Sequence, residues 1–519
     1  MRKLVEFDYK VDKPDINYLK LRVEELMRKG IRLSSNIVEL KGRIEGILKE
    51  LEEEIRKNYG IDNVNSSRQI VEYLKGLKSG EVYEYCYVDG KWSSSKEALS
   101  PLAELGYQFA IDILAYRKMK KYIDSINSLV ENADKNMFIH PTVSLGKTNR
   151  VNYTNPALMN IPKELLWHVI APRREGNIIY SIDIKNQEPN ILIHVLGIEE
   201  LREVLKQDGS LYDNLFKKIF KVKAMAYIHV MDSEYTGYIS KDKVKELGLS
   251  EYYLMPLKVD VPAYYNNKKV DVIEVVNVIT NKGIEPVLPS EVSVDVEGNV
   301  YKLGVKWNEV DKKKLKKEGV IELEGEVLGV DVVCDSVSRS EFKVAWNALT
   351  YGSSLAGLKK ICKNINAEVI YKYFNSLEGY RKYKNVCMEL ANKGSQYIKT
   401  VFGTLLCANE SDKSRLHKVL MDLPIQGTGA DILALLVKHL DNEVSKLGLS
   451  DKVMLYYTRH DELIIEIDKI WYEEKGEECV EGVLRSLLEH RIKGWEPFKL
   501  DIEKVQAKPI SIYDNREEM

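Results

Sequence analysis

The chain has 519 residues, of which 44% are hydrophobic and 30% are charged, a composition typical of a globular protein and not of a disordered one. Its 77 basic and 79 acidic residues leave a formal charge of −2, so any surface for nucleic acid has to be local. We expect no membrane span, because no apolar run approaches about 18 residues. The six scattered cysteines lack a C-x-x-C pair and indicate reduced packing residues in a cytoplasmic protein.

The N-terminal part is predicted to be helical after a short polar lead, residues 1–22. Apolar residues recur at helical spacing in four segments: 36–59, 69–77, 96–105 and 107–130. The last segment carries Arg117 and Lys121 in a run of basic and aromatic residues. Clustered cations of this kind bind phosphate backbones, and a solvated helix face is the alternative.

An apolar, β-prone run from Ile178 to Ile184 contains Asp183, and Pro189 ends the pattern soon after. An aspartate inside an apolar strand is costly unless it is paired or holds a metal ion. A strand end with a solvated acid is the alternative, so Asp183 alone decides nothing.

A second pair of β-prone runs, Val453–Tyr457 and Leu463–Ile467, predicts a hairpin with His460, Asp461 and Glu462 at its tip. Carboxylates from two distant strands can share Mg²⁺, which is usually held by one or two carboxylates together with substrate phosphates. Two such ions clamp the attacking and leaving oxygens of a phosphoryl transfer.

A third stretch places Arg339, Lys343, Asn347 and Tyr351 at four-residue intervals, which forms one stripe on a helix. Two cations one turn apart suit a triphosphate, and an aromatic ring two turns further suits a base. The alternative is a solvated helix face that ends at a glycine cap, Gly352.

With these stretches the chain resembles the family A DNA polymerases, the DNA polymerase I class. Residues 183–188 resemble the first palm motif of that family, 339–352 its nucleotide-binding fingers helix, and 460–462 its last palm motif. Residues 423–432 resemble its helix with Gln-Gly-Thr, and residues 148–162 its primer-side loop. The five motifs occur in the family's order, from about residue 27 to the C-terminus.

The resemblance implies an α+β, right-hand polymerase fold with a thumb, a palm built on an antiparallel sheet and helical fingers. The family pattern is interrupted between the palm motif and the fingers helix by a segment rich in Val, Ile and Tyr. We expect this segment to be an inserted, β-rich accessory domain, close to neutral and available to a protein partner. The expected divisions are 1–22 lead, 23–180 thumb and start of palm, 181–224 palm motif and first fingers helix, 225–330 insert, 331–375 fingers and 376–519 palm.

The resemblance also implies the roles of the site residues. Asp183 and Asp461, with the Ile184 carbonyl, would hold two Mg²⁺ ions, for which Mn²⁺ could substitute, and Glu462 would support them through water. Lys343 would protonate the leaving pyrophosphate. The expected nucleotide-binding residues are Arg339, Lys343, Asn347, Tyr351, Glu188 and Tyr212. The expected primer–template DNA contacts are Arg150, Gln426, His460, Lys418, Arg117 and Lys121.

Glu188 would close the space beside the sugar 2′ position and so favour dNTPs over rNTPs. Two departures from the family pattern stand out. Asn347 replaces an aromatic residue, which alters the sugar contact or shifts the helix register through Trp346. Asn149 replaces a glycine in the primer-side loop, where asparagine tolerates a left-handed backbone.

The expected activity is template-directed DNA synthesis by a bare polymerase module, as in some phage or mobile-element replicators, without a proofreading domain. Two other classes stay open: a single-subunit RNA polymerase or primase of the same fold, and an inactive scaffold that binds DNA. Glu188 favours DNA synthesis over RNA synthesis, and the intact acidic and cationic motifs favour an enzyme over a scaffold.

Overall fold

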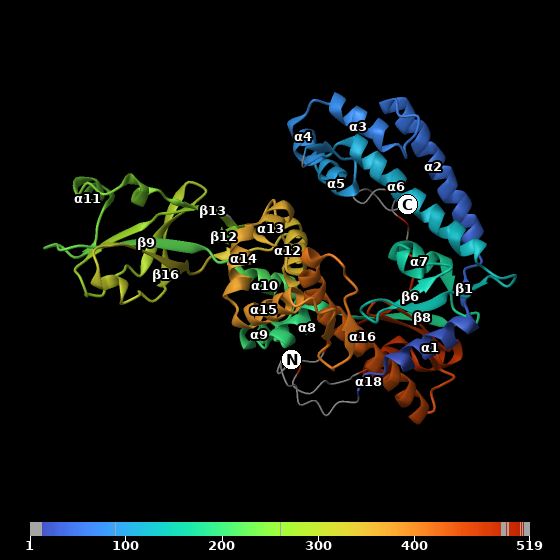
Figure 1. Cartoon of the computed structure of the whole chain (residues 1–519). Coiled ribbons are helices and arrows are strands. Elements are labelled where there is room, and N and C mark those ends of the chain that lie inside the picture. Colours follow the sequence, from blue (N-terminus) through green and yellow to red (C-terminus); the bar gives the residue numbers. More distant parts are fainter. Residues whose placement is uncertain are drawn as a thin grey trace. The chain divides into compact units, whose positions relative to one another are not determined.

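The computed structural model describes residues 13–88, 90–259, 261–488, 495, 498–508, 510 and 512. Contacts divide the chain into two compact units. We call them, by their described residues, the Asp183 unit (13–187, 399–406 and from 426 onward) and the Arg339 unit (188–398 and 407–425). The chain is coloured from blue to red in Figure 1, where most elements are labelled.

The N-terminal half of the Asp183 unit is mainly helical, as predicted, because its apolar residues keep a helical period. Helices α2 and α6 pack along each other, and α5 packs on α6. Its helices are α1 (Ile16–Lys29), α2 (Ile37–Tyr59), α3 (Ser67–Gly76), α4 (Gly80–Cys86), α5 (Lys96–Glu104), α6 (Gln108–Glu131) and α7 (Lys163–Val169). Its short strands are β1 (Ile31–Leu33), β2 (Tyr87–Val88), β3 (Lys91–Trp92), β4 (Phe138–Ile139), β5 (Thr142–Leu145), β6 (Val151–Thr154) and β7 (Ile170–Ala171).

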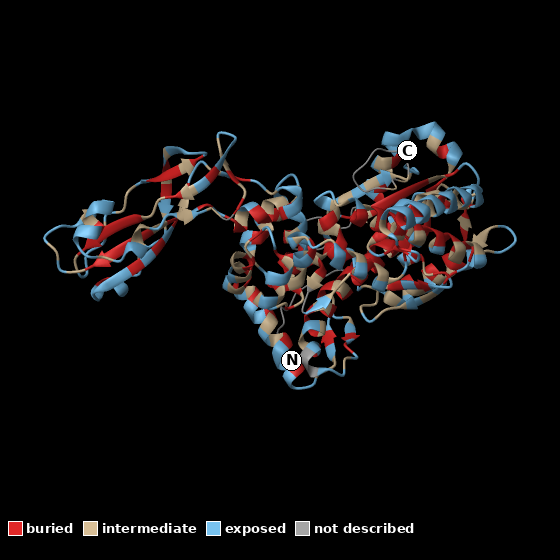
Figure 2. Ribbon diagram, turned by 90° about the horizontal axis from the view of Figure 1, so that it is seen from above, coloured by how far each residue is buried: buried red, intermediate tan, exposed pale blue. Residues whose placement is uncertain are grey.

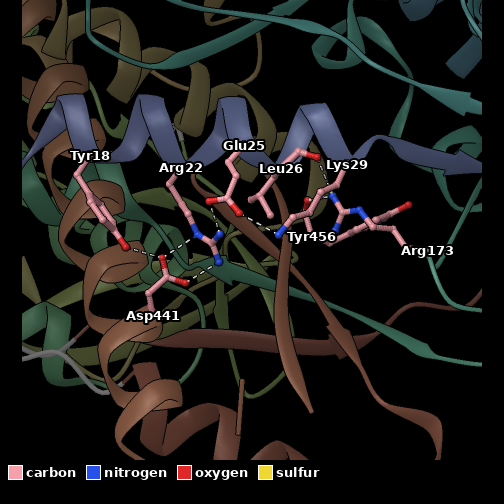
Figure 3. Close-up of polar contacts among 8 residues, drawn as sticks. All are labelled: Tyr18, Arg22, Glu25, Leu26, Lys29, Arg173, Asp441 and Tyr456. Atoms are coloured by element: carbon pink, nitrogen blue, oxygen red, sulfur yellow. Dashed lines mark hydrogen bonds and ion pairs between the residues drawn. The ribbon is translucent and has the colours of Figure 1, made fainter. Parts of the chain in front are cut away.

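The expected polar lead is wrong in its second half, because α1 begins at Ile16 and buries Leu19, Val23 and two later apolar side chains. Residues 1–12 lie outside the described part of the chain. Figure 3 shows how α1 is fastened: Arg22 pairs with Asp441 from two nitrogens, each at 3.0 Å, and Tyr18 donates to the same carboxylate at 2.7 Å. These contacts join residues more than 400 positions apart, so no local sequence pattern predicts them.

The centre of the Asp183 unit is a four-stranded antiparallel sheet in the order β21-β22-β8-β23. It comprises β8 (Ile178–Ile184), β21 (Val453–Arg459), β22 (Glu462–Ile467) and β23 (Leu500–Lys504), with α17 (Lys469–Lys475) and α18 (Glu477–Leu488) between the last two. The predicted strand at 178–184 and the predicted hairpin are confirmed. Glu462 is the exception, because it belongs to β22 and not to the hairpin tip.

The Arg339 unit carries the stripe helix α12 among other helices. These are α9 (Glu199–Lys206), α10 (Leu211–Ile219), α12 (Ser336–Thr350), α13 (Leu355–Ile361), α14 (Ala367–Ser376) and α15 (Glu378–Asn392). Tyr380 on α15 donates to the Leu349 carbonyl of α12 at 2.7 Å, and both residues are buried. Helix α15 therefore packs against the stripe helix at this point, and the predicted division between fingers and palm near residue 375 stays a prediction.

Between α10 and α12 the chain forms one large sheet in the order β10-β14-β9-β17-β16-β15-β13-β12-β18, with β11 paired to β13. Figure 2 shows buried residues running along its strands. The strands are β9 (Lys223–Val230), β10 (Gly237–Tyr238), β11 (Leu257–Lys258), β12 (Ala263–Tyr265), β13 (Lys268–Ile273), β14 (Val276–Thr280), β15 (Glu291–Val296), β16 (Asn299–Trp307), β17 (Gly319–Val327) and β18 (Asp331–Val332). The short helix α11 (Lys241–Glu246) lies between β10 and β11 in the sequence. We call residues 223–332 the insert.

The ends of the insert are adjacent, because β9 and β17 pair antiparallel from Lys223 opposite Glu326 to Val230 opposite Gly319. The Val327 amide also donates to the Val222 carbonyl at 2.9 Å. A β-rich segment with neighbouring ends is what the sequence predicted.

Two helices, α8 (Gln187–Leu196) and α16 (Lys413–Lys446), contain residues of both units. Helix α16 is apolar and long enough to cross a membrane by length and composition alone, but 83% of its most apolar window is buried inside the protein. Burial within the protein explains this composition, as expected for a core helix.

Candidate active site

Asp183 lies near the end of the central strand β8, with a carboxylate opposite it on each side. Its cross-strand partners are Glu462 on β22 and Asp501 on β23. Residues directly opposite each other in an antiparallel pair project from the same face of the sheet. The sheet therefore presents a row of three acids, of which the sequence pointed only to the first two.

Asp461 joins this row from the turn between β21 and β22. The turn consists of His460 and Asp461, and His460 has a left-handed backbone, with φ 54°. His460 is exposed, whereas Asp461 is half-buried. The tight turn thus holds the Asp461 carboxylate beside the end of β22, where its charge acts on Asp183.

Two acids of the cluster have cationic partners in the protein, Glu462 with Lys163 and Asp501 with Lys185 at 3.0 Å. Burial, followed by the charges of Asp461 and Glu462, raises the pKa of Asp183 to about 6, and Lys163 acts in the opposite direction. A half-buried, oxygen-only donor set that repels its own charge fits a hard divalent cation. No group of three or more His, Cys, Asp or Glu side chains in the described residues is arranged to hold a metal alone. The carboxylates present thus fit a Mg²⁺ ion that takes some of its ligands from the protein and the others from substrate phosphates.

Glu462 is already held by other groups. Its carboxylate, 6% exposed, pairs with the Lys163 ammonium at 2.8 Å and with Arg459 at 3.9 Å, and it accepts a hydrogen bond from the Ser181 hydroxyl. Lys163 is the first residue of α7 and faces the acidic row. Sequence reasoning missed Lys163, because one lysine after a proline has no distinguishing pattern.

On α12 the predicted stripe is present as a single helical face. Arg339 and Lys343 are exposed, Asn347 and Tyr351 are half-buried, and Gly352 follows with φ 78°, as the predicted glycine cap requires. Both alternatives for the missing aromatic residue, an altered sugar contact or a shifted helix register, stay predictions.

Trp346 is fully buried and packs edge to face on Phe374, with ring centroids 4.7 Å apart. Its indole therefore belongs to the core of the Arg339 unit, and Asn347 occupies the stripe position. Any sugar contact made at this position involves an amide instead of an aromatic ring.

The two cations of the stripe have different surroundings. The Arg339 Nε lies 3.3 Å from an oxygen of Asp213, at the start of α10. The Lys343 ammonium lies 5.7 Å from the ring centre of Tyr212, which is 6% exposed. The predicted residues Tyr212, Arg339 and Lys343 are thus brought together, and Asp213 joins them without a sequence signal.

At the C-terminal end of the stripe, the Tyr351 hydroxyl donates a hydrogen bond to the Glu188 carboxylate across 163 positions of sequence. Both side chains are half-buried. The structure thus pairs two of the predicted nucleotide-binding residues, and the role of Glu188 in selecting the sugar stays a prediction.

Two of the residues predicted to bind DNA line one cavity of about 420 Å³ between α6 and the loop that follows β6. Lys121 is exposed there, and Arg117 is half-buried and donates to the Ser94 carbonyl. Arg150 is half-buried after a turn in which Asn149 has φ 58°, the left-handed backbone expected of it.

The remaining predicted residues lie on α16 and at the end of β8. Gln426 is half-buried and Lys418 is exposed, while Ile184 is the last residue of β8. Contacts of Gln426 and Lys418 with DNA, and of the Ile184 carbonyl with a metal, stay predictions.

The model of DNA polymerase family A matches residues 34–231 and 325–496 of this chain. The two matched segments cover well over half of the sequence and include all the predicted motifs. The chain belongs to DNA polymerase family A. The gap between the segments lies within the insert, and residues 273–330 match the model of a bacterial Ig-like domain of group 4.

Curated relatives of this family A chain are named DNA polymerase I. The protein of Rhizobium leguminosarum is 22% identical over 430 residues, which cover 78% of this chain and 31% of that protein. The protein of Caldicellulosiruptor bescii is 28% identical over 192 residues, which cover 34% of this chain and 21% of that protein. The matched segments thus span between a fifth and a third of the length of these relatives.

Among solved structures, the family A chain is similar to the POL domain of Pol1 from M. smegmatis in complex with DNA primer-template and dNTP. The TM-score is 0.59 at 16% sequence identity, and the match covers 94% of this chain and 69% of that one. The predicted α+β polymerase fold is therefore confirmed at the level of the fold.

Proposed function

We propose that this chain is a template-directed DNA polymerase that adds dNTPs to the 3′ end of a primer. The observation that carries the proposal is the row of acids at Asp183, joined by Asp461, in a chain whose α12 presents the Arg339–Lys343 pair. An acidic cluster and a cationic stripe are the two parts that phosphoryl transfer needs, because its catalysis is mostly positioning and charge stabilisation.

In this reaction the primer 3′ hydroxyl gives its proton to solvent and its oxygen bonds to the α-phosphorus of the dNTP, while the bond from that phosphorus to the bridging oxygen of pyrophosphate breaks. Arg339 and Lys343 neutralise the triphosphate, and Lys343 gives a proton to the departing pyrophosphate. Asp183 and Asp461, with the Ile184 carbonyl, would hold two Mg²⁺ ions, or Mn²⁺, which supply Lewis-acid stabilisation when bound.

The other residues of the site position the substrates. Glu188, fixed by Tyr351, occupies the space beside the sugar 2′ carbon and so favours dNTPs. Arg150 and Gln426 contact the primer–template, and Arg117 and Lys121 hold its phosphates. The insert binds a protein partner, and residues 1–519 extend primers without 3′–5′ proofreading.

Primer extension on a DNA template tests the proposal, with dNTPs or rNTPs and Mg²⁺. The wild-type chain is expected to extend with dNTPs, while Asp183→Asn and Asp461→Asn abolish extension and retain primer–template binding. A chain that binds DNA without extending it would be a scaffold, and extension with rNTPs alone would indicate an RNA polymerase. Degradation of a mismatched primer without nucleotides would refute the absence of proofreading.

A further inference from the structure

The ion pair between Asp213 and Arg339 involves one of the two cations that the proposed function assigns to the triphosphate. The Arg339 Nε and the Asp213 Oδ1 are 3.3 Å apart, and the side chains are 52% and 33% exposed. The Asp213 Oδ1 atom itself is buried and accepts no hydrogen bond within the described part of the chain. The guanidinium is the cation beside this oxygen, and the Cys334 thiol also contacts the carboxylate.

Lys343, one turn further along α12, provides an internal comparison. Its ammonium lies over the Tyr212 ring, and no carboxylate pairs with it in the described residues. A cation over an aromatic face keeps its charge available, whereas a carboxylate cancels the charge of its partner. Of two neighbouring cations, one is thus neutralised by the protein and the other is not.

Asp213 is held in place by the packing beneath it. The Ser210 hydroxyl caps α10 by accepting from the Asp213 amide, and the aromatic rings of Phe216 and Phe342 join α10 to α12, with centroids 5.5 Å apart at 90°. These contacts hold the backbone of α10 against α12, so only the short side chain of Asp213 is left to move. The longer Arg339 side chain, half-exposed on the first turns of α12, is the partner that can rotate away.

Asp213 also contacts the connection that leads from the insert to α12, through Cys334. Helix α10 precedes the insert, and Cys334 and the α12 cap Asp335 follow it. Burial and the Asp213 carboxylate raise the pKa of the Cys334 thiol to about 12, so the thiol stays neutral and does not add a charge to the ion pair.

We infer that Asp213 is a positioning residue that occupies Arg339 until a triphosphate displaces it. The inference rests on the proposed function. A nucleotide first binds Lys343. Its phosphate oxygens then replace the Asp213 carboxylate as the partner of Arg339. Asp213 thus lowers the affinity for nucleotides. The loss of affinity is greatest for ligands that cannot replace the carboxylate at Arg339.

The test compares wild type with Asp213→Asn and Asp213→Glu in two binding measurements. The first uses the complementary dNTP and a complex with a dideoxy-terminated primer–template, and the second uses inorganic tripolyphosphate and the DNA-free protein. Asp213→Asn is expected to lower both Kd values roughly threefold, since it removes one exposed ion pair. Asp213→Glu, which retains the charge, is expected to stay within error of wild type.

Two controls make the result specific. Glu368→Gln removes a comparable exposed pair in the same unit, Lys359–Glu368 at 2.7 Å, and is expected to leave both Kd values unchanged. In an Arg339→Ala background, Asp213→Asn is expected to have no effect, because the competition requires the guanidinium. Circular dichroism verifies that each variant is folded.

An unchanged or higher Kd for Asp213→Asn would overturn the inference. An equally large decrease in Kd in the Arg339→Ala background would also overturn it, because it would indicate that Asp213 simply repels phosphate. Primer extension by the wild-type protein is measured on the same preparation. Failure there would refute the proposed function and leave the tripolyphosphate result to decide the inference by itself.

Discussion

The Tyr351 hydroxyl donates a hydrogen bond to the Glu188 carboxylate, which fixes an acid at the end of the cationic stripe. Glu188→Ala is expected to raise the incorporation of rNTPs relative to dNTPs by roughly 10-fold to 100-fold, because it opens space for a 2′ hydroxyl. The measurement is kcat/KM for each nucleotide class. Glu188→Gln preserves the volume and serves as the matched control, and equal selectivity in all three proteins would place the discrimination elsewhere.

Lys163 faces the acidic row, so its charge opposes a divalent cation there. Lys163→Met is expected to lower the Mg²⁺ concentration for half-maximal extension by roughly threefold, because it removes one positive charge that lies several ångströms from a solvated cation site. A Mg²⁺ titration of single-nucleotide addition measures this. Lys469→Met removes an exposed lysine of the same unit, paired with Glu473 at 3.8 Å, and should leave the midpoint unchanged. A rise in the midpoint would show that Lys163 orders the site through Glu462.

Asp431 is fully buried on α16, where the hydroxyls of Thr400 and Thr404 donate to its carboxylate. Burial outweighs these hydrogen bonds and raises the pKa of Asp431 to about 6. The folded protein therefore holds this proton more tightly than the unfolded chain does. The ionised group lowers stability above pH 6, and this loss is recovered as the pH falls through 6 towards 4.

Asp431→Asn is expected to raise the Tm at pH 8 and to lose about half of that advantage at pH 5, because the amide mimics the protonated acid. Thermal unfolding at both pH values measures the difference, with the exposed Asp451→Asn as control. A constant difference between variant and wild type at the two pH values would contradict the raised pKa.

Replacing residues 224–325 with a short Gly/Ser linker is expected to leave a folded polymerase, because Lys223 and Glu326 are paired neighbours that a tight turn can join. Single-nucleotide addition at saturating DNA should stay close to wild type, and the number of nucleotides added per binding event should fall. A collapse of the single-addition rate in a folded variant would show that the insert helps to build the nucleotide site.

Much of the candidate site could be predicted from sequence because its signals are local. The run 178–184, the hairpin around His460 and the four-residue spacing from Arg339 each identify an element and the side chains it presents. Lys163, Asp213 and Asp501 could not be predicted in the same way. Each acts through a partner far away in the chain, and the residues around it carry no period or motif that specifies that partner.

The hydrogen bond from the Val327 amide to the Val222 carbonyl has a consequence for the gene. Because the chain leaves and re-enters at one point, a single in-frame exchange of coding sequence would replace the entire sheet of the insert and keep both flanking helices intact. The junction at Val222 and Val327 is therefore a position at which evolution can exchange one inserted domain for another. Engineers can use the same junction to graft a ligand-responsive domain beside Asp213 and Arg339.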